Sequence, residues 1–337
     1  MTQFRAEVYN KAFDFIGHMT LNLNELNEDY ISPKRNKFIV KGQFNAKRNS
    51  FIRILADEQT YCEALIYDVS YNGITSEVEF IDFNSIFDRN IYNETSTGSV
   101  ESQLKALIEA LYLNNEDTLE NMPIEVRTAS TTDGTLATGL VNLHKLIVDA
   151  LKNYNIVVSH SFDYEHKKII INIHQVINEV KYIETSLADI YDVNITAAGS
   201  KSNFNKITYL NEQDSNQKAV YYLTFDNEVT KQSIKRIEPV ISDTKLLKCD
   251  TEKFEETALQ DAEKSLMNTK YNQLIEVLLK KDSKIYYDFE IGQSYKIVVN
   301  DVIYDTVLSG IKKTEGLLLL TFGLSRIDLT EVLKERI

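Results

Sequence analysis

The sequence is poor in the residues that build common phosphate loops and catalytic turns. Its 337 residues include only eleven glycines and three prolines. Neither GxGxxG nor GxxxxGK followed by Ser or Thr occurs, so there is no glycine-rich loop to hold a nucleotide phosphate. The motifs GxSxG and HExxH are also absent, which removes the nucleophile or the metal of the common hydrolase families. Nucleotide chemistry and those hydrolases are therefore disfavoured.

Cysteine and histidine are scarce and scattered. Cys62 and Cys249 have no CxxC or CxxH context, so we interpret both as buried thiols. Zinc needs three or four ligands at one point, and the spacing of the histidines does not favour such a cluster. Asn24 to Asp29 and Asn211 to Asn216 lack the ligand register of a calcium loop and are predicted to be turns. The five histidines are His18, His144, His160, His166 and His174.

The sequence has neither a long apolar run nor an excess of positive charge. No window approaches eighteen apolar residues, and Met1 to Lys11 has no signal-peptide core, so we expect neither membrane insertion nor Sec export. The formal charge of −13, with a pI near 5.0, argues against a surface that grips nucleic acid. The nearest basic cluster, Lys34 to Lys37, is predicted to be a solvated loop or hairpin end.

Acidic and aromatic residues leave two other kinds of site open. Asp288 with Glu290, or Glu255 with Glu256, would serve a glycosidase only if the two acids faced each other across a cleft. The nineteen tyrosines and fifteen phenylalanines would serve a sugar-binding surface, but most of them occupy predicted strand positions, where core packing is expected. We therefore predict that the protein is not an enzyme, with no catalytic residues, no cofactor and no metal.

The last third of the chain has the clearest structural pattern. Alternating apolar residues from Tyr295 to Val299 precede a two-residue turn at Asn300-Asp301, and Leu317 to Phe322 returns after a second turn. This pattern predicts three antiparallel strands within Phe289 to Leu324. Such a meander has one apolar face, which a second sheet or a helix must cover.

The first hundred residues also have the pattern of short antiparallel strands. A turn at Asn72-Gly73 joins the last two of them, and the polar segment Asn93 to Gly98 marks a boundary. Five or six such strands predict a small barrel or sandwich. The expected strands are Thr20 to Leu26, Phe38 to Phe44, Phe51 to Leu55, Cys62 to Ser70 and Ile74 to Asp82.

The middle of the chain changes to a helical period. Apolar residues at i, i+3, i+4 and i+7 from Leu104 predict a helix, with Ser99 as its N-cap. A second repeat, from Leu140 to Leu151, predicts a helix that leads into a hairpin of Ile156 to Phe162 and Lys168 to His174. A compact α+β unit is therefore expected here.

Strands return after this unit, together with one more helix. Apolar residues every four positions from Phe254 to Leu266 predict a helix behind Asp250 that should cover a sheet. Strands are expected at Tyr191 to Ala197, Lys206 to Glu212, Ala219 to Phe225 and Asn272 to Leu279.

The predicted fold class is α+β and mostly antiparallel β, with two small β-barrel domains flanking an inserted α+β unit. We assign the first barrel to residues 1–95 and the insert to residues 96–190. The second barrel is assigned to residues 191–337, with a covering helix near 251–267.

Four segments together resemble the hub family of phage tail tips and contractile-tail baseplates. They are VEFIDFNSIFDRNIY (Val78 to Tyr92), LHKLIVDALKNYNIVVSHSFDYEHKKIIINI (Leu143 to Ile173), KAVYYLTFDNEVT (Lys218 to Thr230) and FEIGQSYKIVVNDVIYDTVLSGI (Phe289 to Ile311). Their order and spacing are similar to the N-terminal hub part of siphophage tail-associated proteins across nearly the whole chain. Many siphophage members continue into a fibre or a peptidoglycan-cleaving module, whereas this chain stops at Ile337, so we transfer no lytic activity.

The resemblance implies a structural protein of a phage or prophage virion. Three subunits would form a homotrimeric ring of six barrels that connects the tail tube to the tip and lets DNA pass in transit. The implied partners are the distal tail protein ring, the tape-measure protein, and receptor-binding or fibre proteins. The implied location is the virion tail tip, after assembly in the host cytoplasm. The competing interpretations are a cell-wall-polymer hydrolase and a carbohydrate-binding adhesion module of the tail tip.

Overall fold

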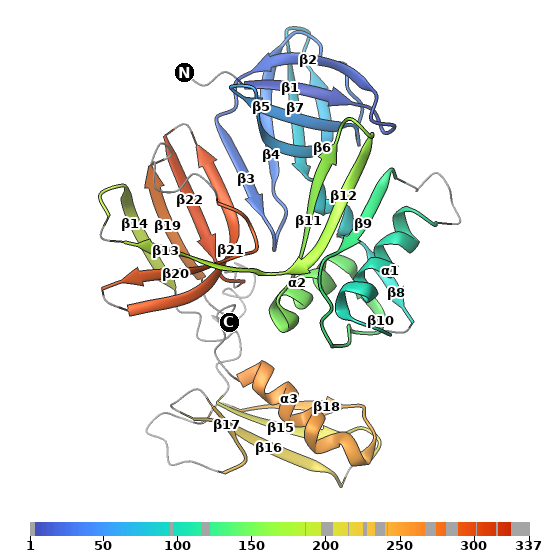
Figure 1. Cartoon of the computed structure of the whole chain (residues 1–337), viewed down its shortest axis with the longest axis vertical. Coiled ribbons are helices and arrows are strands. Elements are labelled where there is room, and N and C mark those ends of the chain that lie inside the picture. The colour runs from blue at the N-terminus through green and yellow to red at the C-terminus, as the bar shows by residue number, and fades with distance from the viewer. Residues whose placement is uncertain are drawn as a thin grey trace. The chain divides into compact units, whose positions relative to one another are not determined.

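The computed structural model describes residues 4–94, 97–115, 122–185, 187–196, 205–214, 216–224, 228–232, 240, 242–266, 274–280, 289–300, 302–314 and 316–324. This part of the chain is mostly antiparallel β-structure with three α-helices (Figure 1). The chain forms two compact units. Unit 1 comprises Met1–Val193 and Glu276–Phe322, and unit 2 comprises Asn194–Ile275 and Gly323–Ile337.

Unit 1 begins with a six-stranded antiparallel sheet in the order β2-β1-β5-β6-β7-β4. The sheet curls until its two edge strands approach each other at an isolated bridge between Asn22 and Ile39. Alternate residues, such as Ile52, Ile54 and Phe80, are fully buried inside the curl. The strands are β1 (Phe4–Tyr9), β2 (Phe15–Leu21), β4 (Arg35–Lys41), β5 (Phe51–Ala56), β6 (Gln59–Tyr71) and β7 (Thr75–Asp82).

Most of the predicted strands in this sheet are confirmed, and two predictions need correction. The β6–β7 hairpin turns at Asn72-Gly73, where Gly73 has a φ of +93°, a conformation that glycine adopts readily. The single strand expected from Thr20 to Leu26 and the turn expected from Asn24 to Asp29 are both wrong, because the chain leaves the sheet after β2 and forms a separate strand, β3 (Glu25–Asp29). Strand β1 was missed, although its alternate residues are buried in the core.

The two α-helices described in unit 1 follow the first curled sheet in the sequence. Helix α1 (Val100–Tyr112) packs on β9 (Ile124–Thr128), and α2 (Leu143–Tyr154) packs on β11 (Ile156–Asp163). Strand β11 forms a hairpin with β12 (Lys168–Gln175), which pairs in parallel with β9. This arrangement confirms the predicted helix-to-hairpin passage. The remaining elements are η1 (Phe83–Phe87), β8 (Asn90–Asn93) and β10 (Gly139–Asn142).

The starts of the two helices differ in how well the sequence predicted them. The predicted N-cap Ser99 is confirmed, because its side chain accepts a hydrogen bond from the Ser102 amide. The prediction that Leu140 belongs to the second helix is wrong. Leu140 lies in β10, paired with Tyr92 of β8, and the helix begins only after Asn142, whose side chain caps the Lys145 amide at 3.1 Å.

A second curled sheet completes unit 1 and contains the predicted C-terminal meander. Its main path runs β13-β20-β21-β22-β19-β14, and β3 pairs with β21 beside this path. The antiparallel pairs β20–β21 and β21–β22 confirm the meander, while Asp301 of the predicted turn lies outside the described residues. The strands are β13 (Ile177–Glu184), β14 (Ile190–Thr196), β19 (Leu274–Lys280), β20 (Gln293–Val299), β21 (Val302–Thr314) and β22 (Leu317–Phe322).

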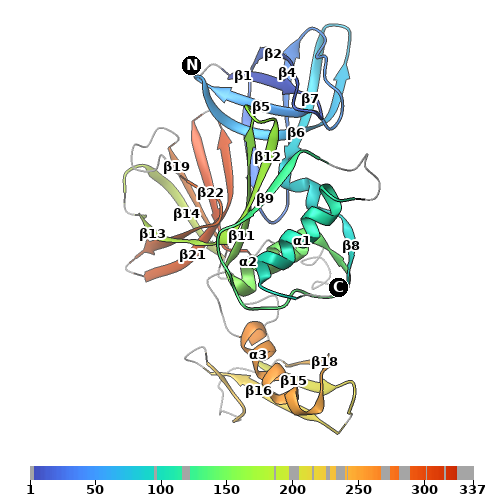
Figure 2. The same cartoon turned by 45° about the vertical axis from the view of Figure 1, so that its right-hand side comes forward.

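Unit 2 is a four-stranded sheet with one helix on one of its faces (Figures 1 and 2). The order is β17-β16-β15-β18, and the elements are β15 (Lys206–Asn211), β16 (Lys218–Leu223), β17 (Val229–Thr230), β18 (Ser242–Leu247), η2 (Thr251–Lys253) and α3 (Phe254–Leu266). The predicted apolar stripe of α3 packs against Ile207, Tyr209 and Tyr221. The helix therefore covers this sheet and not a curled one. Asp250 precedes η2 and makes no side-chain capping bond.

Candidate functional site

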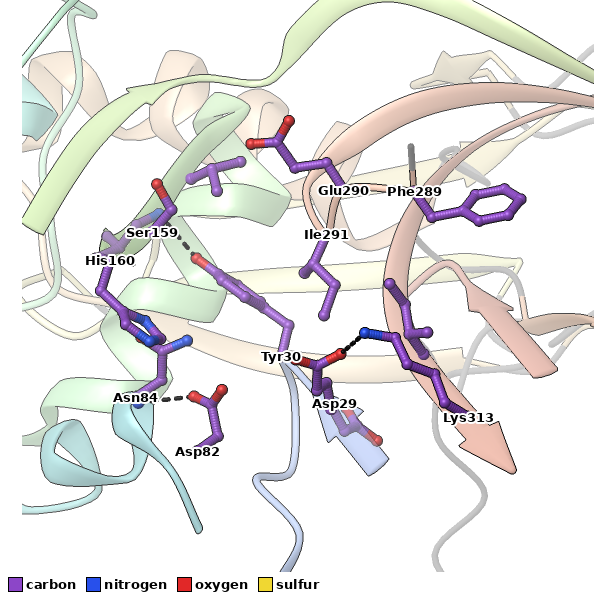
Figure 3. A pocket seen from close by; sticks show the side chains of 14 residues that line it. Asp29, Tyr30, Asp82, Asn84, Ser159, His160, Phe289, Glu290, Ile291 and Lys313 are labelled. Atoms are coloured by element: carbon purple, nitrogen blue, oxygen red, sulfur yellow. Dashed lines mark hydrogen bonds and ion pairs between the residues drawn. The ribbon is translucent and has the colours of Figure 1, made fainter. Parts of the chain in front are cut away.

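A pocket of about 280 Å3 lies within unit 1, where segments from distant parts of the sequence meet (Figure 3). Its walls come from the end of β3, the corner between β7 and η1, strand β11, residues 289–291 and strand β21. Four carboxylates line it, Glu28, Asp29, Asp82 and Glu290, against the single ammonium group of Lys313. The lining is therefore predominantly acidic.

Tyr30 lines this pocket and forms hydrogen bonds with three neighbouring elements. Its hydroxyl accepts a hydrogen bond from the Val158 amide at 3.0 Å, and its own amide donates to the Ser309 carbonyl at 2.9 Å. His144 Nε2 donates to the Tyr30 carbonyl at 2.9 Å. Burial raises the pKa of the Tyr30 phenol, so this hydroxyl stays protonated and acts as a structural acceptor.

Three of the four carboxylates of the pocket, Glu28, Asp29 and Asp82, have structural partners. Glu28 Oε2 lies 3.0 Å from Lys313 Nζ, and that ammonium also lies 4.7 Å from the centre of the Tyr61 ring. Asp82 accepts from the Asn84 amide at the start of η1, and Asp29 accepts from the Ile31 amide. These contacts hold the corners of the chain in place.

The histidines and cysteines do not meet. His144 contacts Tyr30, while the His160 ring lies 5.0 Å from Phe83. His166 pairs with Asp163 in the hairpin turn, His174 contacts Ser159, and His18 stacks on Phe15. Across the described residues, no group of three or more His, Cys, Asp or Glu side chains is placed to hold a metal ion. Cys62 is buried, which raises its thiol pKa, and Cys249 packs at the edge of the core of unit 2.

The two carboxylate pairs considered from the sequence are Asp288 with Glu290 and Glu255 with Glu256. Glu290 lies on the exposed wall of the pocket, and Asp288 is outside the described residues. Glu255 and Glu256 both lie in the first turn of α3, where Glu255 pairs with Lys231 at 2.7 Å. No paired-carboxylate cleft is formed by the described members of these pairs.

The basic cluster Lys34 to Lys37 was expected to be a solvated loop or hairpin end. Its three cationic residues are exposed and Lys34 lies in a loop, but the prediction is wrong for Arg35 and Lys37, which belong to a strand. Arg35 and Lys37 lie in the edge strand β4, because the alternating residues Asn36, Phe38 and Val40 are buried in the first curled sheet. The Arg35 guanidinium lies 3.8 Å from the Tyr67 ring centre and 3.8 Å from Glu79. Lys37 Nζ lies 3.7 Å from Glu77. Carboxylates of the neighbouring strand β7 therefore offset these cations.

A second joint, which the sequence did not reveal, fixes the β11–β12 hairpin to the first curled sheet. The Glu63 carboxylate of β6 accepts hydrogen bonds from the Phe162 amide and the Tyr164 hydroxyl, each at 3.0 Å. Phe13 and Phe51 pack beside Phe162, with ring centres 5.5 Å away in both cases. The partners are about a hundred residues apart in sequence, so no local pattern predicts the contact.

The described helices include none that is both long and apolar enough to cross a membrane.

No protein-family model and no curated protein matches the sequence. Solved structures do match over nearly the full length. The 43 kDa tail protein of prophage MuSo2 from Shewanella oneidensis has a TM-score of 0.59 at 9% identity, covering 95% of this chain and 97% of that one.

Two further structures agree with this likeness. Prophage tail protein gp18 from Listeria monocytogenes EGD-e has a TM-score of 0.56 at 13% identity, covering 99% and 98% of the two chains. A chain of the phage P2 baseplate in its activated conformation with Ca has a TM-score of 0.55 at 9% identity, covering 96% and 100%. The chain therefore shares its fold with these phage tail and baseplate proteins.

This shared fold agrees with the resemblance that the four sequence segments indicated, and the structure adds two contacts that the sequence did not predict. The predicted resemblance is confirmed at the level of the fold. The acidic pocket and the contacts of Glu63 both lie where different segments of unit 1 meet. Side chains that are distant in sequence connect these segments.

Proposed function

We propose that this chain is a structural hub protein of a phage or prophage tail tip or baseplate. One observation carries the proposal: the likeness to tail and baseplate proteins extends over nearly the whole of this chain and of those chains. Because one fold can host unrelated functions, the proposal is tested on the assembled tail.

In the proposed assembly three copies form a ring that joins the tail tube and the distal tail protein ring to the tip. The tape-measure protein and receptor-binding or fibre proteins are the other proposed neighbours, in a virion tail that assembles in the host cytoplasm. DNA passes through the ring in transit. We expect carboxylates to outnumber Lys and Arg on the surface that faces the axis, because a basic lining would hold phosphates.

The domain boundaries near residues 95 and 190 are part of the same proposal. The first curled sheet is built entirely from residues before 83, and the helices and hairpin of the insert lie between residues 100 and 175. The second barrel would then consist of the second curled sheet, which also takes in β13 from before residue 190 and β3 from the first segment, with unit 2 as an excursion between β14 and β19.

A reconstruction of the tail that contains this chain tests the proposal. We expect three copies around a three-fold axis at the tip of the tube. A single copy, or a dimer without a ring, would contradict the hub role.

We also propose that the chain does not cleave peptidoglycan or host polysaccharide. The paired acids that would support such a reaction do not form a cleft among the described residues. A zymogram of the purified protein should show no lytic band. A band that the Glu290→Gln substitution abolishes would support the competing hydrolase instead.

A further inference from the structure

The sheet of unit 2 has one face that no described element covers. Helix α3 lies on the opposite face, against Ile207, Tyr209, Ala219 and Tyr221. Residues that alternate with these therefore point away from the helix. We call this surface the lysine face; it consists of Lys206, Thr208, Leu210, Lys218, Val220, Tyr222, Thr230, Ser242, Thr244 and Leu246.

The lysine face is cationic in a protein whose formal charge is −13. Its ten residues include two lysines and no carboxylate, while Glu212 and Glu228 lie just beyond the strand ends. Neither Lys206 nor Lys218 forms an ion pair with a described residue. Lys206 Nζ lies 5.8 Å from the centre of the Tyr222 ring. The face also presents Leu246, which is 63% exposed. A sheet face with unpaired cations and an exposed leucine resembles an uncovered interface more than a solvated surface.

The outer side of α3 has the opposite character. Glu256, Leu259 and Glu263 recur at i, i+3 and i+7 of α3, so they form one stripe along the helix. Together with Glu252 of the preceding turn η2, we call them the carboxylate stripe. All four are exposed, and none of the three carboxylates has an ion-pair partner among the described residues. The buried stripe that begins at Phe254 contacts the sheet, so the carboxylate stripe points away from it.

We propose that the lysine face of one copy docks on the carboxylate stripe of a second copy of this chain. Two lysines meet three carboxylates, and Leu246 and Leu259 provide an apolar centre. The two surfaces lie on opposite sides of the same unit, so one copy cannot satisfy both. The contact is head-to-tail, and contacts of this kind close into rings or grow into open filaments. This proposal rests on the hub role, to which it adds a specific contact between neighbouring subunits.

The size of the surface sets the expected strength. Four strands about 4.8 Å apart and about five residues long give a flat area of roughly 300 Å2. Stable interfaces bury about 800 Å2 on each partner. The isolated contact should therefore be weak, and its charges should make it sensitive to salt. In a ring the other subunit contacts would raise the effective concentration of the two surfaces.

Charge reversal on each side, alone and together, tests the contact in the full chain. The face variant carries Lys206→Glu and Lys218→Glu, the stripe variant carries Glu256→Lys and Glu263→Lys, and a third variant carries all four changes. Lys41→Glu with Lys47→Glu, two exposed lysines of unit 1, is the control with the same change in net charge as the face variant. Self-association is measured by sedimentation velocity up to about 1 mM protein, at low and at physiological salt.

We expect wild type to associate reversibly and to reach a limit at the trimer. The face and stripe variants should each weaken association by about tenfold or more, the fourfold variant should recover most of it, and the control should match wild type. A monomeric wild type, or a fourfold variant no better than the single-side variants, overturns the proposal. Circular dichroism confirms that each variant is folded.

Three other outcomes separate this contact from a nucleic-acid surface and from the hub role. If the face variant loses binding to labelled single-stranded DNA while self-association is unchanged, the lysine face is a nucleic-acid surface and the proposal is wrong. If the charge variants behave as expected but a tail reconstruction lacks the chain at the tip, the contact stands and the hub role fails. If the variants change nothing while the reconstruction shows the ring, the hub role stands without this contact.

Discussion

At the scale of single residues, Glu63 is the side chain that most directly links two parts of unit 1. Its carboxylate accepts two hydrogen bonds from the β11–β12 hairpin, and one donor is the backbone amide of Phe162. Glu63→Ala should lower the free energy of unfolding by about 2 kcal/mol, because a half-buried donor loses a charged acceptor. Denaturant unfolding measures the effect. Glu77→Ala, which removes only an exposed pair with Lys37, should change stability by less than about 0.5 kcal/mol.

Glu101 gives a prediction that depends on pH. Its fully buried carboxylate accepts from Ser130 Oγ at 2.6 Å and from the amide and hydroxyl of Thr132 at 2.8 Å. Burial raises its pKa, but the hydrogen bonds from Ser130 and Thr132 outweigh burial and leave the pKa below its usual value of 4.5. A pKa lowered by folding stabilises the protein above pH 4.5, and this stabilisation is lost as the pH falls through the folded-state value.

The Glu101→Gln variant tests this linkage. It should be less stable than wild type by about 2 kcal/mol at neutral pH, since an amide is a weaker acceptor than a carboxylate. The difference should shrink as the pH is lowered to about 3. Glu109→Gln on the same helix, where the carboxylate faces Lys105 at 3.7 Å, is the control and should show a difference under about 0.5 kcal/mol. A gap that stays constant with pH would contradict the linkage.

At the scale of secondary-structure elements, the link between α2 and β11 depends on one residue. Asn155 adopts a left-handed conformation with a φ of 58°, and its amide donates to the carbonyls of Ala150 and Leu151. Asn155→Gly should therefore be tolerated within a few tenths of a kcal/mol, whereas Asn155→Val should cost about 1–2 kcal/mol. Thermal unfolding measures both. Asn153→Val, in the last turn of the same helix, is the matched control and should have a smaller effect.

The elements also show what local patterns predict and what they cannot. Period-two and period-3.6 repeats predicted β5 to β7, the β11–β12 hairpin, α1, α3 and the terminal meander, because each pattern reports a buried face within one element. Strand β3 was not predicted as a separate element, because its partner β21 lies almost three hundred residues away. Leu140 fits the helical spacing of α2, but Asn142 caps that helix and leaves Leu140 in β10.

The candidate site could not be predicted from the sequence, because its residues are also far apart along the chain. Glu28 and Lys313 form an ion pair in the pocket, and no spacing rule joins residues so far apart. Acidic residues are abundant in this chain, so Glu28 carries no local signal that separates it from a solvated carboxylate. The absence of phosphate-loop and protease motifs was, by contrast, readable directly from the sequence.

At the scale of the whole molecule, unit 2 enters and leaves through neighbouring strands. The Lys280 amide, at the end of β19, donates to the Asp189 carbonyl, just before β14 begins. Because β14 and β19 are neighbours in the sheet, this contact indicates an antiparallel pair. The end of β14 should therefore lie beside the start of β19, at the two points where the chain passes between the units.

This geometry predicts that unit 2 is dispensable for the folding of unit 1. Replacing residues 197–273 with a short glycine-containing turn should leave unit 1 folded, with a cooperative thermal transition. The same deletion should remove the self-association attributed to the lysine face. Calorimetry and sedimentation velocity check the two outcomes. Loss of cooperative unfolding would show that the two units fold together.

The pairing of β3 with β21 has a consequence during synthesis of the protein. About 270 residues separate the two strands, so at roughly 5–20 residues per second β3 leaves the ribosome some 15–55 s before its partner exists. During that interval the backbone of β3 has no partner strand, although Leu26 already has the early core residues of the first curled sheet to pack against. The nascent chain must therefore carry an unpaired strand edge through most of its own translation, and the three carboxylates of β3 (sequence ELNED) disfavour wrong edge-to-edge pairing until the last strands emerge.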